Sequence, residues 1–336
     1  MNILVIRFTS LGDLVTLEPA FRAIRRFFPD AKITFVTSGM GKGLYADSGY
    51  FDEVVVFGGN YGLIWKTLWH QRYDLTINLQ CNRPSHILMM GLKSDRILNS
   101  SSAWWQKFLG LKGKTKWPPE LLRLAGIDEA RITEFFGSEE LSAIHLPFRS
   151  DSAAVDAVRS AYPDRKIVAV APGASERWES KKWGDRRYSD LVKKLMEAQI
   201  GVVLVGSAAE RDSGQLIEAE NPGVVNLIEK TSLSELKGVL AACDILVGND
   251  SGPAHLAAGV GTDTITIFGS TDIKHCVKMM PYRGRHEYLV AEPRLECQPC
   301  YKSKCPTQHE CMAAIGVEDV FRMIEKSVAG AAQQGK

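Results

Sequence analysis

The sequence predicts an α/β protein made of two similar domains, each a parallel sheet covered by helices. Three observations support this: a length of 336 residues, short apolar runs that alternate with amphipathic stretches, and a restart of that alternation at residue 166. The alternation indicates parallel strands, because each parallel connection needs a crossover helix. The length favours two domains over one. We therefore expect one domain over residues 1–155 and a second over residues 156–336.

The expected strands are short runs rich in β-branched and aromatic residues. In the first domain they are residues 2–8, 32–37, 53–57 and 74–79. In the second domain they are residues 166–173, 201–207, 223–228, 244–250 and 264–270. The clearest amphipathic helices are predicted for residues 13–28, after the first strand, and for residues 317–328 near the end of the chain.

Composition and charge exclude few functions, and the N-terminal residues and the lengths of the apolar runs favour a cytosolic protein. The 41 basic and 39 acidic residues nearly cancel, so nothing demands a nucleic-acid partner. The N-terminal residues do not have the charged and apolar regions of a signal peptide, and no apolar run of about 18 residues suggests a membrane span. We therefore expect a cytoplasmic location and mostly reduced cysteines.

The predicted strand 244–250 ends in Asp250, and Ser251, Gly252 and Pro253 follow it. Ligands of open α/β sheets bind beyond the carboxyl ends of strands. Ser251 suits a helix N-cap, Gly252 lets a ligand approach the backbone, and Pro253 suits the first helical turn. Free amides and the helix dipole there favour a phosphate. Asp250 would repel phosphate, so we expect it to face hydroxyl groups; the alternative is a turn that only caps the helix.

Two other strand ends also carry residues suited to a nucleotide sugar. Gly173 ends the strand 166–173, and Ser175, Lys181 and Lys182 lie before the next helix; glycine, hydroxyl and lysine together suit a diphosphate. Glu210 follows another strand end, where an acidic residue can accept hydrogen bonds from a ribose diol. The alternatives are a solvated basic loop and an ordinary residue on a helix surface.

The first strand leads into the sequence TSLGD, residues 9–13. It lacks the G-x-G-x-x-G pattern of classical dinucleotide sites, and the sequence holds no G-x-x-x-x-G-K-[ST] pattern of a P-loop. Asp13 stands where a helix-capping residue would stand. Its functional interpretation is a general base that faces a cleft between the domains, and capping alone is the alternative.

The acceptor side is less distinctive. Arg83 and Lys93 flank an apolar run after the fourth strand, and their charges suit phosphorylated sugars. An ordinary helix with solvated ends is the alternative. Further on, aromatic residues alternate with basic ones, which suits an anionic membrane interface, although buried tryptophans would explain part of the pattern. These residues are Trp104, Trp105, Trp117, Lys107, Lys112, Lys114 and Lys116.

Four cysteines lie close together near the C-terminus with the spacing C-x2-C-x4-C-x5-C. They are Cys297, Cys300, Cys305 and Cys311. Such a cluster can hold zinc or an iron–sulfur centre. The intervals of four and five residues, however, are shorter than the loops of common zinc ribbons. We therefore favour thiols or a disulfide over a metal, in a segment that braces the fold before the last helix.

The motifs SLGD, PGAS with KKW, GNDSGPAHLAAGVGT and TIFGSTD occur in this order over almost the whole chain. In combination they resemble glycosyltransferase family 9, the heptosyltransferases. The resemblance implies a GT-B architecture, in which two Rossmann-like domains with parallel sheets face each other across a cleft. It places the acceptor in the first domain and the nucleotide-sugar donor in the second. The implied reaction is inverting transfer of heptose from ADP-heptose to the inner core of lipopolysaccharide.

The resemblance also implies roles for individual residues. Asp13 matches the catalytic base, and Lys181, rather than its neighbour Lys182, matches the lysine that contacts the phosphates and the sugar. Asp250 matches the residue that binds the heptose hydroxyls. The remaining donor-binding residues are Ser175, Ser251 and Gly252 on the phosphates, Glu210 on the ribose, Thr231 beside the adenine, and His255 in the same pocket.

The implied enzyme needs no cofactor, because a lysine and a helix N-terminus can stabilise departing ADP without a metal. Its partners are the nucleotide-sugar donor and a lipopolysaccharide-type acceptor, with peripheral contact at the cytoplasmic face of the inner membrane. Two alternatives stay open: a GT-B transferase or epimerase that uses another nucleotide sugar, and a non-catalytic protein that senses nucleotide or metal. The oligomeric state is not predicted.

Overall fold

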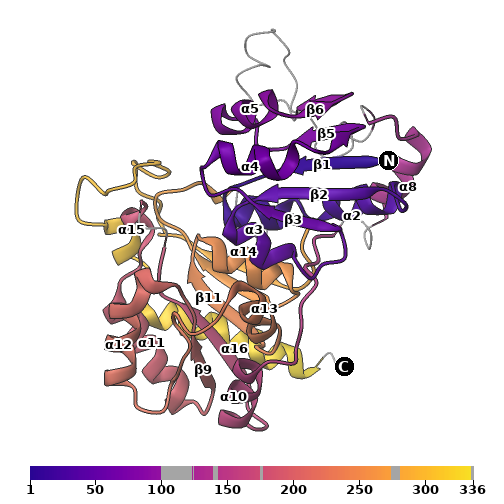
Figure 1. The fold of residues 1–336 in the computed structure, drawn as a ribbon. Coiled ribbons are helices and arrows are strands. Elements are labelled where there is room, and N and C mark those ends of the chain that lie inside the picture. The colour runs from indigo at the N-terminus through magenta and orange to yellow at the C-terminus, as the bar shows by residue number, and fades with distance from the viewer. Residues whose placement is uncertain (100–122, 124, 139–142, 175–176, 274–280, 334–336) are drawn as a thin grey trace. The chain divides into compact units, whose positions relative to one another are not determined.

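A computed structural model describes residues 1–99, 123, 125–138, 143–174, 177–273 and 281–333 of the chain (Figure 1). The chain divides into two compact units, Met1–Pro147 and Phe148–Lys336. The division precedes the boundary that we placed after residue 155, because helix α10 (Ala153–Ala161) packs against helix α13 (Leu233–Ala241) of the second unit. In the described residues no helix is both long and apolar enough to cross a membrane.

The first unit contains a five-stranded sheet of order β3-β2-β1-β5-β7, in which every pairing is parallel. Its strands are β1 (Asn2–Ile6), β2 (Lys32–Thr37), β3 (Glu53–Val56), β5 (Leu75–Asn78) and β7 (Ile97–Asn99). A separate parallel pair is formed by β4 (Arg72–Tyr73) and β6 (Lys93–Ser94). The helices are α1 (Leu11–Thr16), α2 (Glu18–Phe27), α3 (Gly39–Tyr45), α4 (Tyr61–Leu68), α5 (Arg83–Met90) and α8 (Glu129–Gly137).

The second unit contains a six-stranded parallel sheet of order β10-β9-β8-β11-β12-β13. Its strands are β8 (Ile167–Ala171), β9 (Gly201–Leu204), β10 (Val225–Asn226), β11 (Ile245–Asn249), β12 (Asp263–Ile267) and β13 (His286–Leu289). Its remaining helices are η1 (Glu179–Lys181), α11 (Asp185–Glu197), η2 (Ala208–Glu210), α12 (Arg211–Glu220), α14 (Gly252–Gly259), α15 (Glu310–Ala313) and α16 (Val317–Gln333). Figure 1 shows α11 and α12 side by side, and α11 also contacts β9.

The central strands are apolar along their length because both faces of each sheet are covered. All five residues of β8 and all five of β11 are buried, which is typical of strands in a doubly covered parallel sheet. The sequence prediction of two parallel α/β units is confirmed, and each predicted strand is present, although most strands end earlier than predicted and β10 retains only Val225 and Asn226. The short strands β4, β6, β7 and β13 were not predicted.

The helix that we predicted for residues 13–28 is two helices. Leu17 ends α1 and begins α2, and Pro19 lies in the first turn of α2. Proline has no N–H to donate to the preceding turn, and it disfavours helical geometry at the residue before it. The apolar positions continue through the break, since Leu14 and Val15 of α1 and Phe21 and Ile24 of α2 are all buried.

Candidate active site

The strand order of the second unit reverses between β8 and β11. The chain adds β9 and β10 on one side of β8, then returns to place β11 and β12 on the other side. Ligands of open α/β sheets bind outside the carboxyl ends of the strands at such a switch point. The segments that follow β8 and β11, including α14, carry most of the residues that we predicted to bind the donor.

Lys181 and Asp250, predicted from separate stretches of sequence, meet at this switch point. Nζ of Lys181 lies 2.6 Å from Oδ2 of Asp250, and the two side chains are only 16% and 15% exposed. Nζ also donates to the backbone carbonyl of Asp250 over 3.2 Å. It lies 5.1 Å from the ring centre of Trp178, a cation–π geometry. A cation suited to phosphate and an anion suited to hydroxyls thus stand side by side.

Thr271 is the third member of this cluster. Its Oγ1 donates to the same Oδ2 of Asp250 over 2.7 Å. Thr271 follows β12, the strand beside β11, so its loop opens at the same edge of the sheet. Three strand-end loops therefore converge on one carboxylate oxygen.

Asn249, the last residue of β11, ties these loops together. It is fully buried, and its Nδ2 donates to the carbonyls of Pro172 and Gly173 over 2.9 Å each. Its Oδ1 accepts a hydrogen bond from the backbone N–H of Trp183 over 3.1 Å. The indole of Trp183 is buried in turn and donates to the carbonyl of Ile315 over 2.9 Å. The loop that carries Lys181 is therefore anchored on both sides of that residue.

The N-terminus of α14 has the arrangement that the sequence predicted. Ser251 is the N-cap, Gly252 is the first helical residue and a proline lies in the first turn. The Ser251 hydroxyl donates to the carbonyl of Asn249 over 3.2 Å and makes no capping hydrogen bond to the helix. A phosphate bound to the first-turn amides would therefore not compete with that side chain.

Glu210 is buried, and its carboxylate accepts hydrogen bonds from its own loop. Its Oε2 accepts hydrogen bonds from the backbone N and the Oγ of Ser207, each over 2.8 Å. Gly173 lies against this carboxylate, since a Cβ at position 173 would lie 2.2 Å from Cγ of Glu210. The loops after β8 and β9 are thus in contact because position 173 has no side chain. Binding of a ribose by Glu210 remains a prediction.

The other predicted donor residues are less informative. Thr231 directly precedes Ser232, the N-cap of α13. His255 lies within α14, and its Nδ1 is 3.0 Å from the hydroxyl of Tyr282. Burial raises the pKa of Tyr282, so this hydroxyl keeps its proton and can donate to Nδ1. Ser175 lies outside the described residues, as do the tryptophans and lysines between residues 104 and 117.

In the first unit the strand order reverses between β1 and β5, and Asp13 follows β1 at that point. Its Oδ2 accepts hydrogen bonds from N and Oγ of Ser10, each over 3.0 Å, and lies 2.9 Å from Nη2 of Arg7. Ser10, not Asp13, is the N-cap of α1, and Asp13 completes the capping box from the first turn. Because the side chain is still 56% exposed, capping does not prevent it from meeting a substrate.

The structure does not bring Arg83 and Lys93 together. Arg83 is the first residue of α5, directly beyond the carboxyl end of β5. Lys93 begins β6, which pairs with β4, and β4 directly precedes β5. Lys93 therefore lies near the opposite edge of the sheet, where its Nζ is 5.6 Å from the ring centre of Trp69. Only Arg83 lies at the same edge as Asp13.

The four clustered cysteines line one cavity and are all free thiols. They are Cys297, Cys300, Cys305 and Cys311. Burial opposes the shift, but hydrogen bonds with the Thr307 hydroxyl and with the backbone of Thr307 and His309 lower the pKa of Cys305. In the described part of the chain, no group of three or more His, Cys, Asp or Glu residues is placed to hold a metal ion.

The segment that carries these cysteines braces the loops of the candidate donor site. Ser180 donates through Oγ to the carbonyl of Lys302 over 2.5 Å, and its Oγ lies 2.9 Å from Oγ of Ser270. The carbonyl of Ser270 accepts from the backbone N–H of Tyr301 over 2.8 Å. Ser180 and Ser270 directly precede Lys181 and Thr271, so the brace acts next to the cluster at Asp250.

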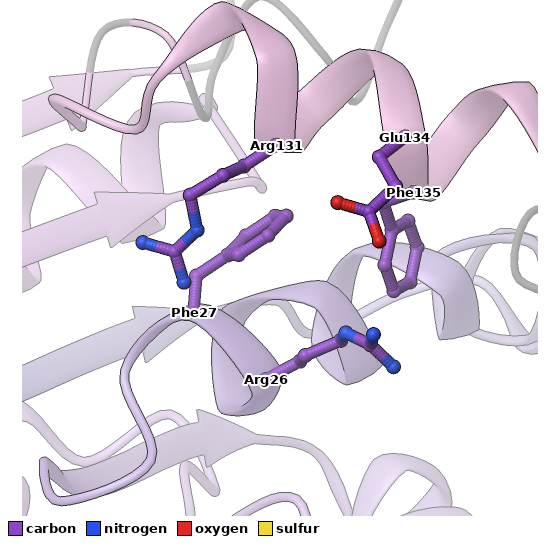
Figure 2. Close-up of a pocket in the computed structure, with 5 residues that line it drawn as sticks. All are labelled: Arg26, Phe27, Arg131, Glu134 and Phe135. Carbon is purple, nitrogen blue, oxygen red and sulfur yellow. The ribbon is translucent and has the colours of Figure 1, made fainter.

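A pocket of about 160 Å³ in the first unit lies away from these residues. It is lined by Arg26, Phe27, Arg131, Glu134 and Phe135, from the C-terminal end of α2 and from α8 (Figure 2). The Arg131 guanidinium lies 5.1 Å from the ring centre of Phe27. Because α2 runs back from the carboxyl edge of the sheet, its last residues lie near the amino edge. We therefore do not assign this pocket to the reaction.

Sequence reasoning missed three residues of these sites: Arg7, Asn249 and Thr271. Arg7 and Asn249 stand in strand-end stretches that we had singled out, but a hydrogen bond across a loop leaves no pattern in the sequence. Thr271 lies in the motif TIFGSTD. The one available signal was its position, since it follows the strand that pairs with the strand before Asp250.

The chain matches the model of glycosyltransferase family 9 (heptosyltransferase) over residues 62–310. Lipooligosaccharide heptosyltransferase 2 of Campylobacter jejuni is 25% identical over 322 residues, which cover 93% of this chain and 94% of the relative. Lipopolysaccharide heptosyltransferase 3 of Escherichia coli K12 is 25% identical over an alignment of 345 residues, and the match covers 94% of each chain.

Solved structures support the same assignment of fold. The structure of E. coli ADP-heptose lps heptosyltransferase II matches with a TM-score of 0.76 at 20% identity, covering 99% of this chain and all of that one. A family 9 glycosyl transferase from Veillonella parvula matches with a TM-score of 0.74 at 17% identity, covering 98% and 97%. The predicted GT-B fold is confirmed. The chain belongs to glycosyltransferase family 9 and is a glycosyltransferase, as its motifs predicted.

Proposed function

We propose that the protein is an inverting heptosyltransferase that moves heptose from ADP-heptose to the inner core of a lipopolysaccharide-type acceptor. The observation that carries this proposal is the pairing of Lys181 with Asp250 beside the N-terminus of α14. Relatives named as lipooligosaccharide and lipopolysaccharide heptosyltransferases support the acceptor class. A structural neighbour named for ADP-heptose supports the donor.

On the donor side, the reaction needs positive charge where ADP departs. Lys181, the N-terminus of α14 and the Gly252 amide would supply it, so no bound metal is required by the proposal. Asp250 would hold hydroxyl groups of the heptose, and Glu210 would hold those of the ribose. This division follows charge, because phosphate favours the lysine and neutral hydroxyls favour the carboxylates.

On the acceptor side, Asp13 would remove the proton from the attacking hydroxyl as its oxygen bonds to the anomeric carbon of the donor. The bond from that carbon to the phosphate oxygen breaks in the same step, and the electron pair leaves with ADP. One such displacement inverts the anomeric centre. Arg83 would contact a phosphate of the acceptor.

We expect this reaction at the cytoplasmic face of the inner membrane, where the protein would bind peripherally. The stretch between residues 101 and 117, on which that expectation depends, lies outside the described residues. Sedimentation with anionic liposomes at low and high salt would test it, and binding that does not respond to salt, or no binding, would contradict it.

Titration calorimetry with ADP, UDP and GDP, followed by turnover of ADP-heptose on a truncated lipopolysaccharide, tests the function. We expect selective binding of ADP and a product whose anomeric configuration, determined by NMR, is inverted. Asp13→Asn should bind ADP normally and lose about 10²- to 10⁴-fold in kcat. Asp47→Asn, at an exposed carboxylate of the same unit, is the matched control and should transfer normally.

Preference for UDP or GDP would keep the family and remove the named donor, since another nucleotide sugar would then be the substrate. Retention of configuration would contradict a single displacement. Normal transfer by Asp13→Asn would show that Asp13 only caps α1.

A further inference from the structure

The carboxylate of Asp250 is held from two sides. Lys181 Nζ lies 2.6 Å from its Oδ2, and Thr271 Oγ1 donates to the same oxygen over 2.7 Å. In the described part of the chain, both hydrogen bonds go to Oδ2. The other oxygen, Oδ1, is therefore the one left to meet a ligand.

The position of Thr271 is fixed by its neighbour. Ser270 is 1% exposed, its Oγ lies 2.9 Å from Oγ of Ser180, and its carbonyl accepts from the backbone of Tyr301. The Thr271 hydroxyl is therefore presented to Asp250 by a buried and hydrogen-bonded backbone. A group held in this way can orient its partner without moving when substrate binds.

We propose that Thr271 is a positioning residue of the donor site. It holds Oδ2 of Asp250 so that Oδ1 faces the sugar of the donor, and it keeps Asp250 in place when Lys181 turns toward the diphosphate. The proposal rests on the proposed function only in requiring a nucleotide-sugar donor. It does not depend on which sugar is transferred or on the role of Asp13.

Without the Thr271 hydroxyl, Lys181 alone would determine the orientation of Asp250. Binding of the diphosphate would then compete with that role, because one ammonium group would serve two anions. The sugar would lose its fixed partner, whereas the nucleotide would keep its own contacts. The effect should therefore appear in transfer and not in the affinity for ADP.

The test compares Thr271→Val and Thr271→Ser with the matched control Thr266→Val. Thr266 lies in β12, is 2% exposed, and its hydroxyl has no hydrogen-bond partner among the described residues. We expect Thr271→Val to lower kcat/KM for the donor by about 10- to 100-fold, the usual effect of losing a hydrogen bond to a charged group. Thr271→Ser should restore most of the rate, and Thr266→Val should match the wild type.

Titration with ADP and thermal unfolding separate positioning from folding. The proposal holds if Thr271→Val binds ADP as the wild type does, unfolds at the same temperature and transfers poorly. It is overturned if Thr271→Val transfers normally, if it loses ADP affinity in proportion to its rate, or if Thr271→Ser is as slow as the valine variant. Should the wild type use another nucleotide sugar, the named donor fails, and the same comparison with that sugar still tests Thr271.

Discussion

Each unit ends the strand beside its switch point with a fully buried asparagine, but the two asparagines hold different parts of the molecule. In the first unit, Asn78 ends β5 and its Oδ1 accepts hydrogen bonds from the backbone of Gln80 and Cys81, each over 3.2 Å. Its Nδ2 donates to Asn99 of β7 over 3.0 Å. Asn78 therefore stabilises its own loop and an outer strand.

In the second unit, Asn249 donates back across the switch point to the loop after β8 and accepts from Trp183. The corresponding link in the first unit is made by Gln80, a half-buried side chain whose Oε1 accepts from the backbone of Phe8 over 2.9 Å. Buried hydrogen bonds thus hold the loops of the candidate donor site in place, whereas more exposed hydrogen bonds hold the region of Asp13. This difference would suit the proposed reaction, in which a small nucleotide sugar binds to the second unit and a large lipopolysaccharide-type acceptor binds to the first.

The largest effect is expected for Asn249→Leu. It would leave the Trp183 N–H and two carbonyls without their partner, at a cost of about 3 kcal/mol or more in the free energy of unfolding. It should also abolish ADP binding, because the loops of Lys181 and Asp250 lose their common anchor. Urea unfolding and calorimetry with ADP measure the two effects.

Asn78→Leu is the matched variant in the first unit. We expect a comparable loss of stability there, with ADP binding retained when the protein is folded. If Asn249→Leu binds ADP like the wild type, or if Asn78→Leu loses ADP binding to the same degree, the two asparagines do not differ as we describe.

A smaller effect is expected for Gly173→Ala, which would force Glu210 out of its capping box with Ser207. Overpacking of this kind costs about 1–3 kcal/mol, and ADP affinity should fall with stability because the loops after β8 and β9 separate. The double variant Gly173→Ala/Glu210→Ala removes the clash and should recover stability. A double variant that is no more stable than Gly173→Ala would place the strain elsewhere in the loop.

The sequence alone predicted the fold and the location of the candidate site because both depend on short-range patterns. Apolar runs identified the strands, and the rule that ligands bind at strand ends selected Asp250 and the two lysines Lys181 and Lys182. The family resemblance then favoured Lys181, which the structure places beside Asp250. Thr271 and Asn249 could not be found in this way. Their roles depend on contacts between loops far apart in the sequence, and a threonine or a buried asparagine at a strand end has no pattern of its own.

Lys93 and Asp13 show two other limits. Arg83 and Lys93 were both predicted to contact phosphorylated sugars, but helix α5 lies between them, and Lys93 is in β6, near the opposite edge of the sheet. Asp13 was predicted as a general base, with helix capping as the alternative; Ser10 takes the cap position, and Asp13 supports it from the first turn. Both cases concern where a helix begins and ends, which periodicity defines poorly.

Among its described residues, the first unit holds one buried carboxylate, which sharpens the comparison. Glu18 is fully buried, and burial raises its pKa, although His145, Tyr50 and Arg22 donate hydrogen bonds to it. With a folded pKa above the unfolded value of about 4.5, the folded state binds this proton more tightly. The resulting stabilisation is present below that value and is lost as the pH rises through the folded pKa.

Glu18→Gln should therefore remove this part of the pH dependence. We expect the free energy of unfolding of the wild type to fall relative to that of the variant as the pH rises from about 4 towards neutrality. Urea unfolding over that range measures the difference, with Asp47→Asn as a control at an exposed carboxylate. A difference that grows in the opposite direction would show that Arg22 outweighs burial.

The smallest effect on the free energy of unfolding is expected at Asp13, which we propose as the general base. Asp13 is 56% exposed and its partner Arg7 is 18% exposed, so solvent screens their ion pair and Asp13→Asn should change the free energy of unfolding by less than about 1 kcal/mol. Asp250→Asn, at a side chain that is 15% exposed, should cost more, since it leaves Lys181 without its carboxylate. Urea unfolding of both variants at one pH tests this order. If Asp13→Asn proves the more destabilising, the region around Asp13 is as rigid as the donor site, and an open acceptor side cannot explain how the two units differ.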